Sequence, residues 1–325
     1  MPLSRRSTFT LALAALATLS ALEARAQAFP AKPLKLVVNF PPGGAADVIG
    51  RALAQQMGDQ LKQTVVVENR PGANGNIGAD AVAKSPADGH TLLMSSGGAM
   101  TVNPFLYSKM PFDAEKDLLP VASVARVLVF LVCHPTLPVA NLADFIAYAK
   151  ANPGKLSYGS PGTGSSPHLA TEMFRRQARF EATHVPYKGA APALTDLLAG
   201  QLQFMFDPGP GLRHVKDGKL KLLAVGSPRR SGQVPDTPTL AELGVTGFDA
   251  DTTFGVYAPG GTPAALVAQL HEEINKALGS ARVQDVIKGI GGEPAALSRA
   301  DFIAGQARDR ARFGAFIQEI GLKVE

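Results

Sequence analysis

The feature that most constrains the fold of this 325-residue chain is a local pattern that occurs twice: an apolar strand, a glycine-rich turn and a helix. In the first copy "KLVVNF" leads into "PPGGAAD", and in the second "KLSYGS" leads into "PGTGSSPH". The copies lie about 120 residues apart, and further strand-like and helix-like segments alternate along the chain. Strands that alternate with helices are typical of α/β proteins. The pattern therefore predicts an α/β fold whose sheets are mostly parallel.

Two long extended segments divide this series into two parts. The run "LLPVASVARVLVFLVCHP" (118–135) is apolar throughout and longer than an ordinary strand, and "FDADTTFGVYAP" (248–259) would bring the chain back. We interpret both as extended crossing segments between two α/β lobes with a cleft between them. The first lobe would comprise residues 27–126 and 252–325, and the second lobe residues 127–251.

The N-terminus is typical of an export signal. Arg5 and Arg6 precede the apolar run "TLALAALATLSAL", which is too short to span a bilayer comfortably. The "ARA" that ends at Ala26 is an A-x-A cleavage pattern, with "AQA" two residues later as an alternative. We therefore predict a signal peptide over residues 1–26 and a periplasmic mature protein. An uncleaved membrane anchor is the competing interpretation.

Charge and cysteine content exclude several classes of function. Removal of residues 1–26 lowers the net charge from +5 to +3, a mild basic excess that is spread along the chain. Nucleic-acid binding is therefore not expected. The single cysteine, Cys133, excludes an internal disulfide framework and a cysteine zinc site. The histidines are far apart and form no H-E-x-x-H motif, so neither a metal nor another cofactor is expected.

The common catalytic and nucleotide-binding motifs are also missing from the sequence. Gly159 to Gly164 has the glycine spacing of a P-loop, but Ser165 and Ser166 follow where a P-loop needs Lys. Neither G-x-G-x-x-G nor G-x-S-x-G occurs. Cys133 and His134 are neighbours in an apolar strand, so their side chains should point to opposite faces. The sequence therefore favours binding over catalysis.

Glycine turns that lead into helices suit a negatively charged ligand. Glycine lets backbone N–H groups approach the ligand, and the helix N-terminus adds partial positive charge. Ligands of open α/β sheets bind where the strands end, so residues at other strand ends are candidates too. The predicted ligand-binding residues are Phe40, Pro42, Gly43, Gly44, Ala45, Ala46, Asp47, Ser95, Ser96, Ser160, Gly162, Thr163, Gly164, Ser165, His168, Tyr187 and Asp207.

Some of these candidates have an alternative structural role. His168 could contact the ligand or only brace the glycine loop. Asp207, at a strand end, could cap a helix or bind a ligand amine. Ser95 and Ser96 could offer hydroxyls to the ligand or only shape a turn.

Several long blocks of the sequence resemble one known family. They include "KLVVNFPPGGAADVIGRALAQQM", "VVVENRPGANGNIGADAVAKSPADGHTLLM", "ANPGKLSYGSPGTGSSPHLATEMF" and "HVPYKGAAPALTDLLAGQLQFMFD". In these blocks the chain is similar to the Bug-type solute receptors, the periplasmic substrate-binding proteins of tripartite tricarboxylate transporters. The resemblance extends in order over essentially the whole mature chain.

The resemblance implies a type II periplasmic-binding-protein (Venus flytrap) fold and a monomeric receptor. Its ligand would be a small carboxylate: a di- or tricarboxylate, an acidic amino acid or an aromatic acid. The loops matching Pro41–Asp47 and Ser160–His168 would clasp one carboxylate, and the partner would be a two-subunit membrane permease. A periplasmic enzyme acting on a small acid and a sensory receptor are the alternatives.

The chain departs from the family pattern at two places near the expected cleft. Thr252, Thr253 and Phe254 stand where relatives usually carry a Trp before the aromatic residue, and Ala45 and Ala46 stand where many relatives have Thr or Ser. Both departures suggest a less polar pocket, suited to a monocarboxylate or to an acid with an apolar tail.

Overall fold

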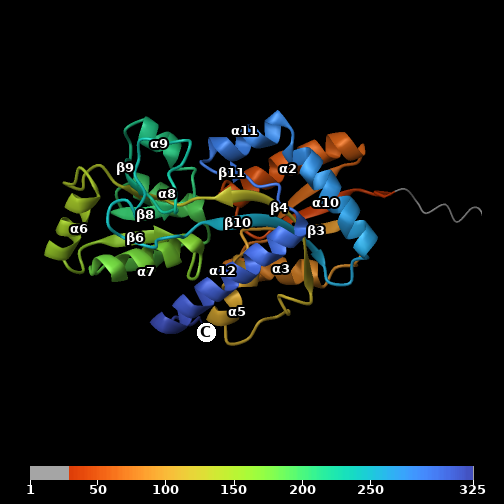
Figure 1. The fold of residues 1–325 in the computed structure, drawn as a ribbon, viewed down its shortest axis with the longest axis horizontal. Helices are drawn as coiled ribbons and strands as arrows, with labels where there is room; N and C mark the ends of the chain where they lie inside the picture. Colours follow the sequence, from red (N-terminus) through yellow and green to blue (C-terminus); the bar gives the residue numbers. More distant parts are fainter. Residues whose placement is uncertain (1–28, 325) are drawn as a thin grey trace, which may run out of the picture.

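The chain folds into two lobes that lie side by side, each built on its own sheet (Figure 1). The structure is a computed structural model that describes residues 29–324. The predicted signal peptide, residues 1–26, lies outside the described residues. Within them, every helix is too short or too polar to span a lipid bilayer.

The first lobe holds a six-stranded sheet in the order β11-β4-β10-β3-β1-β2. Helices α2, α10 and α11 pack on one face of this sheet, and α3, α4 and α12 pack on the other. The strands are β1 (Leu34–Val38), β2 (Val65–Asn69), β3 (Thr91–Ser95), β4 (Leu118–Val127), β10 (Thr252–Pro259) and β11 (Glu293–Pro294). The helices are α2 (Ala45–Leu61), η1 (Ala73–Gly75), α3 (Asn76–Ala83), α4 (Gly98–Thr101), α5 (Asn103–Leu106), α10 (Ala264–Leu278), α11 (Ala281–Gly289) and α12 (Arg299–Ile320).

The second lobe holds a five-stranded sheet in the order β7-β6-β8-β5-β9. Helices α6 and α7 cover one face and α8 and α9 the other. The strands are β5 (Phe130–Cys133), β6 (Ser157–Ser160), β7 (Thr183–Pro186), β8 (Phe204–Asp207) and β9 (Lys221–Val225). The helices are α6 (Leu142–Ala151), α7 (Ser166–Ala178), α8 (Ala190–Leu198) and α9 (Leu212–Lys216).

The segments predicted to cross between the lobes are strands of the two sheets. The first crossing consists of β4 in one sheet and β5 in the other, separated only by the buried residues Leu128 and Val129. The return crossing enters the first sheet as β10. In Figure 1, β4 and β10 run side by side from the first lobe toward the second.

The prediction of mostly parallel sheets is wrong. β1 pairs in parallel with β2 and β3, and β6 pairs in parallel with β7 and β8. The strands at the crossings run the other way, because β10 is antiparallel to β3 and β4, and β5 is antiparallel to β8 and β9. A chain that enters and leaves a lobe through its sheet adds antiparallel strands to the parallel β–α–β units.

Helix α12 of the first lobe also contacts the second lobe. Leu169 of α7 is buried in a small apolar cluster with Leu106 of α5 and with Phe313 and Ile317 of α12. An ion pair of 2.6 Å between Arg312 Nη1 and an Asp249 carboxylate oxygen joins the same two lobes. The lobes are therefore packed together outside the crossings as well.

Candidate functional site

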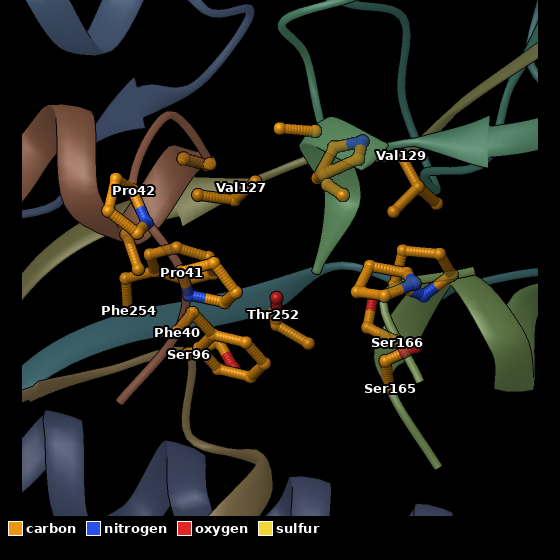
Figure 2. Close-up of a pocket in the computed structure, with 18 residues that line it drawn as sticks. Phe40, Pro41, Pro42, Ser96, Val127, Val129, Ser165, Ser166, Thr252 and Phe254 are labelled. Atoms are coloured by element: carbon orange, nitrogen blue, oxygen red, sulfur yellow. The ribbon is translucent and has the colours of Figure 1, made fainter. Parts of the chain in front are cut away.

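A cavity lies between the lobes, where the two glycine loops face each other (Figure 2). Its empty space, including the part open to solvent, is about 570 Å³. Residues at the start of three helices line it: Gly44, Ala45 and Ala46 of α2, Ser165 and Ser166 of α7, and Ala190 and Ala191 of α8. The predicted meeting of the two glycine turns is thus found in the structure.

The first loop is held from behind by the carboxylate of Asp47. One oxygen accepts from the N–H of Gly43 at 3.0 Å, and the other accepts from Asn69 Nδ2 at 2.9 Å. Arg51, one turn further along α2, binds both oxygens. Burial alone would raise the pKa of Asp47, but the hydrogen bonds from Arg51, Gly43 and Asn69 outweigh it and lower the pKa. Asp47 is therefore ionised and already paired, and it does not line the cavity.

The second loop is held by neutral imidazoles. His168 Nδ1 accepts from the N–H of Gly164 at 3.0 Å, and the His168 ring stacks on His184 with 4.0 Å between centroids. His184 Nε2 lies 2.7 Å from Ser160 Oγ, which also accepts from the N–H of Gly162. Burial lowers the pKa of His168 to about 3 and that of His184 to about 4. Of its two predicted roles, His168 is thus placed in the bracing one.

The predicted site residues fall into three groups. Seven of them line the cavity: Phe40, Pro42, Gly44, Ala45, Ala46, Ser96 and Ser165. Two line a neighbouring hollow: Gly162 and Tyr187. The others line neither: Gly43, Asp47, Ser95, Ser160, Thr163, Gly164, His168 and Asp207.

Three of the strand-end candidates bond to the protein itself. Ser95 Oγ accepts from Asn39 Nδ2 at 3.0 Å, and the Tyr187 hydroxyl donates to Asp196 at 2.6 Å. Asp207 is fully buried, and its Oδ2 accepts from the N–H groups of Gly209 and Gly211 just before α9. Asp207 thus braces the turn that leads into α9, and α9 itself has no side-chain cap.

Eleven cavity residues were not among the predicted ligand-binding residues. Four of these lie inside the two predicted loops: Pro41, Pro161, Ser166 and Pro167. Four come from the crossings: Val127, Val129, Thr252 and Phe254, of which only Thr252 and Phe254 were expected near the cleft. The other three are Ala190, Ala191 and Pro208. The start of α8 had a usable signal, because "HVPYKGAAPAL" is a third copy of strand, glycine and helix.

The chain shares its sequence and fold with one family of receptors. A family model described as "Tripartite tricarboxylate transporter family receptor" (TctC) matches residues 49–322. This chain belongs to that family. The receptor is 40% identical to the protein BugT of Bordetella pertussis over 303 residues, which are 92% of this chain and 93% of BugT.

Solved structures agree with this assignment. Rpa4515 of R. palustris, solved with adipate, superposes with a TM-score of 0.87 at 36% identity, covering 91% of the receptor and all of that chain. MatC of Rhodopseudomonas palustris, solved with bound malate, gives a TM-score of 0.82 at 28% identity, covering 89% and 100%. The receptor thus has the two-lobed fold of the Bug and TctC periplasmic binding proteins.

Membership in the family decides between binding and catalysis. The family consists of periplasmic solute-binding receptors and not of enzymes. The cavity agrees with a binding role, since helix termini and small side chains line it rather than a nucleophile beside a base. Residues 29–324 also contain no cluster of His, Cys, Asp and Glu that could hold a metal ion.

Proposed function

We propose that this receptor binds a small organic carboxylate between its lobes and delivers it to a two-subunit tripartite tricarboxylate-type permease. The observation that carries the proposal is the meeting of three helix N-termini at one cavity between the lobes. Adipate and malate, the ligands of Rpa4515 and MatC, are both carboxylates. These ligands of similar proteins support the same ligand class here.

The helix termini suit a carboxylate because their N–H groups have no partner within the helix. Gly44, Ala45 and Ala46 occupy the N-cap and the first two positions of α2, and Ala190 and Ala191 open α8. Hydrogen bonds to a charged acceptor contribute about 1.5–3 kcal/mol each, and the helix dipoles add to them. No formal cation is needed to hold the ligand, which suits reversible release.

The remaining parts of the proposal concern the working protein as a whole. We propose that residues 1–26 are a cleaved signal peptide and that the mature receptor acts as a periplasmic monomer. The lobes would be residues 27–126 with 252–325, and residues 127–251. Closure of these lobes around the ligand would signal the permease.

The test compares organic acids with their amides on ligand-free protein purified from the periplasm. An acid at about a hundred times its dissociation constant should stabilise the protein by roughly 2.7 kcal/mol, which a melting curve resolves. The amide of the same acid should give no shift, because it lacks the charge that the helix termini bind. Equal shifts with acid and amide, or no shift with any acid, would contradict the carboxylate site.

A pair of variants locates the binding site. Ala45→Asp puts a carboxylate at the cavity end of α2, a position where a helix tolerates it well, and should abolish the acid-dependent shift. Gln55→Asp makes the same charge change on the exposed side of α2 and should leave the shift intact. Uptake of the identified acid should also stop in cells that lack the receptor. Normal uptake with a lost response to the acid would instead indicate a sensory receptor.

A further inference from the structure

We propose that the ligand of this receptor is a monocarboxylate with an apolar tail, and that Thr252 lies beside that tail. This inference rests on the proposed function and names the substrate class of the same site. Away from the helix termini the cavity wall is apolar, and Val127, Val129, Phe254 and Pro208 supply it from both lobes. Figure 2 shows Val127 and Phe254 on one side of the cavity, Val129 on the other and Thr252 between them.

The hydroxyl groups of the lining are few, and two of them are already used. Ser165 Oγ donates to the carbonyl of Gly162 at 2.7 Å, and Ser166 Oγ donates to the carbonyl of Ala250 at 3.0 Å. Each hydroxyl has one proton to donate, so neither can also donate to a ligand. Among the described residues that line the cavity, this leaves Ser96 and Thr252 as side chains with a free hydroxyl proton.

The lining residues of the described chain also carry no formal charge. Arg126 is the neighbour of Val127, but as the next residue of a strand it points away from the cavity. Its guanidinium binds Asp251, Glu293 and Ser227 instead.

Two further cations lie near the glycine loops. Arg51 is committed to Asp47 and Asn69. Lys188 lines the neighbouring hollow, and its side chain is exposed, where an ion pair contributes little. A second carboxylate at the far end of a ligand, away from the helix termini, would therefore lose its water and find neither a helix N-terminus nor a cation in exchange. An apolar tail at the same place would instead bury its surface against the valines and Phe254.

The test uses adipate and hexanoate, which have the same chain length and differ only in the second carboxylate. Titration calorimetry on ligand-free receptor should show hexanoate binding at least about tenfold more tightly than adipate, a difference of about 1.4 kcal/mol. Benzoate and terephthalate form a second pair with an aromatic tail, and the monoacid should again bind more tightly.

A matched pair of variants tests the position of the tail. Thr252→Lys would place a cation inside the cavity and should shift the preference toward adipate by at least about tenfold. Thr253→Lys adds the same charge at the next residue of β10, which is also half-buried but does not line the cavity, and should leave the preference unchanged. Ligand-free melting curves of both variants check that each one folds.

The outcomes separate this inference from the proposed function. If adipate bound as tightly as hexanoate, or more tightly, the proposal of a monocarboxylate ligand would be wrong. The proposal that the receptor binds a carboxylate would still hold. Equal shifts of preference in the two lysine variants would overturn the placement of the tail at Thr252. If neither acid of either pair bound to ligand-free receptor, the inference and the proposed function would both fail.

Discussion

The two glycine loops at the cavity have nearly the same backbone geometry, yet different chemistry holds each one. Gly43 has φ +83° and Gly164 has φ +81°, both in the left-handed region that favours glycine. The N–H of Gly43 donates to the carboxylate of Asp47, whereas the N–H of Gly164 donates to the imidazole of His168. In each case the acceptor lies four residues further along the chain.

The difference lies in what surrounds each acceptor. Asp47 is an ionised carboxylate paired with Arg51, whose side chain is 52% exposed. His168 is a buried neutral ring stacked on His184, and beneath this pair the Tyr158 hydroxyl donates to Glu172 at 2.6 Å. The same local pattern in the sequence can thus be supported by an ion pair with a half-exposed arginine or by a buried aromatic stack. The two kinds of support should respond differently to added volume, pH and salt.

The largest expected effect comes from filling the space beside each glycine. A Cβ at position 164 would lie 2.1 Å from Leu106 Cδ2 across the lobe interface, whereas a Cβ at position 43 would lie 3.8 Å from its nearest neighbour, Ala191 Cβ. Gly164→Ala should therefore lower the free energy of unfolding by about 3 kcal/mol, from backbone strain and overpacking together. Gly43→Ala should cost about 1–2 kcal/mol, from strain alone.

Urea denaturation of the two ligand-free variants measures this difference as a shift of the midpoint at constant slope. Gly164→Ala should also weaken ligand binding more than Gly43→Ala, because it forces the lobes apart at Leu106. Equal losses of stability would mean that the buried contact with Leu106 adds nothing and that the two loops are equivalent.

The next largest difference between the loops is expected in how the stability of the protein depends on pH. The pKa of His168 is lowered from 6.5 to about 3, so between these values the unfolded chain takes up a proton that the folded chain refuses. Stability therefore falls as the pH falls through this window, by up to about 1.4 kcal/mol per pH unit for one imidazole. The pKa of Asp47 is lowered from 3.8, so its contribution is present above that value and is lost only at lower pH.

The variants His168→Gln and Asp47→Asn test this contrast between pH 6.5 and pH 4. The glutamine keeps an acceptor for Gly164 and removes the titrating ring, so the fall in stability should flatten. The asparagine should give a curve parallel to that of the wild type. Burial raises the pKa of Asp207 and Asp251 to about 6 and gives an opposite slope, but all three proteins share that slope. If the stability of His168→Gln fell with pH in parallel with that of the wild type, a group other than His168 would cause the loss of stability in acid.

The sequence predicted both loops because everything that defines them is local. An apolar strand, a glycine at positive φ and a helix start follow one another within about ten residues, and each leaves its own signal. The cavity walls are different. Thr252 and Val127 are paired with each other where β4 ends and β10 begins, and both line the cavity. No local sequence pattern shows which side of a crossing strand faces the other lobe.

The strand-end candidates show the same limit. Tyr187 and Asp207 lie at strand ends of the second lobe, as predicted, because Tyr187 directly follows β7 and Asp207 is the last residue of β8. Their side chains turn to nearer partners, Asp196 for the tyrosine and the Gly209–Gly211 turn for the aspartate. A strand end brings a residue to the edge of the cleft, but competition for hydrogen-bond partners decides whether its side chain enters.

The smallest expected effect concerns salt, and it tests whether the charge of Arg51 matters to the first loop. Arg51→Ala removes an ion pair whose arginine is half exposed, so the loss of stability should be about 0.5–1 kcal/mol and should shrink as ionic strength rises. Asp47 would keep its bonds from Gly43 and Asn69, so the loop should keep its shape and ligand affinity should change little.

The matched change in the second lobe is Arg175→Ala, which removes the ion pair with Glu172. Both carboxylates are nearly buried, but the side chain of Arg175 is 34% exposed and that of Arg51 is 52% exposed. Because salt screens a less exposed charge less, the loss from Arg175→Ala should shrink less in high salt. Urea titrations of both variants at low and high salt provide the measurement. A loss from Arg51→Ala that does not change with salt would contradict the view that the half-exposed charge of Arg51 supports the first loop.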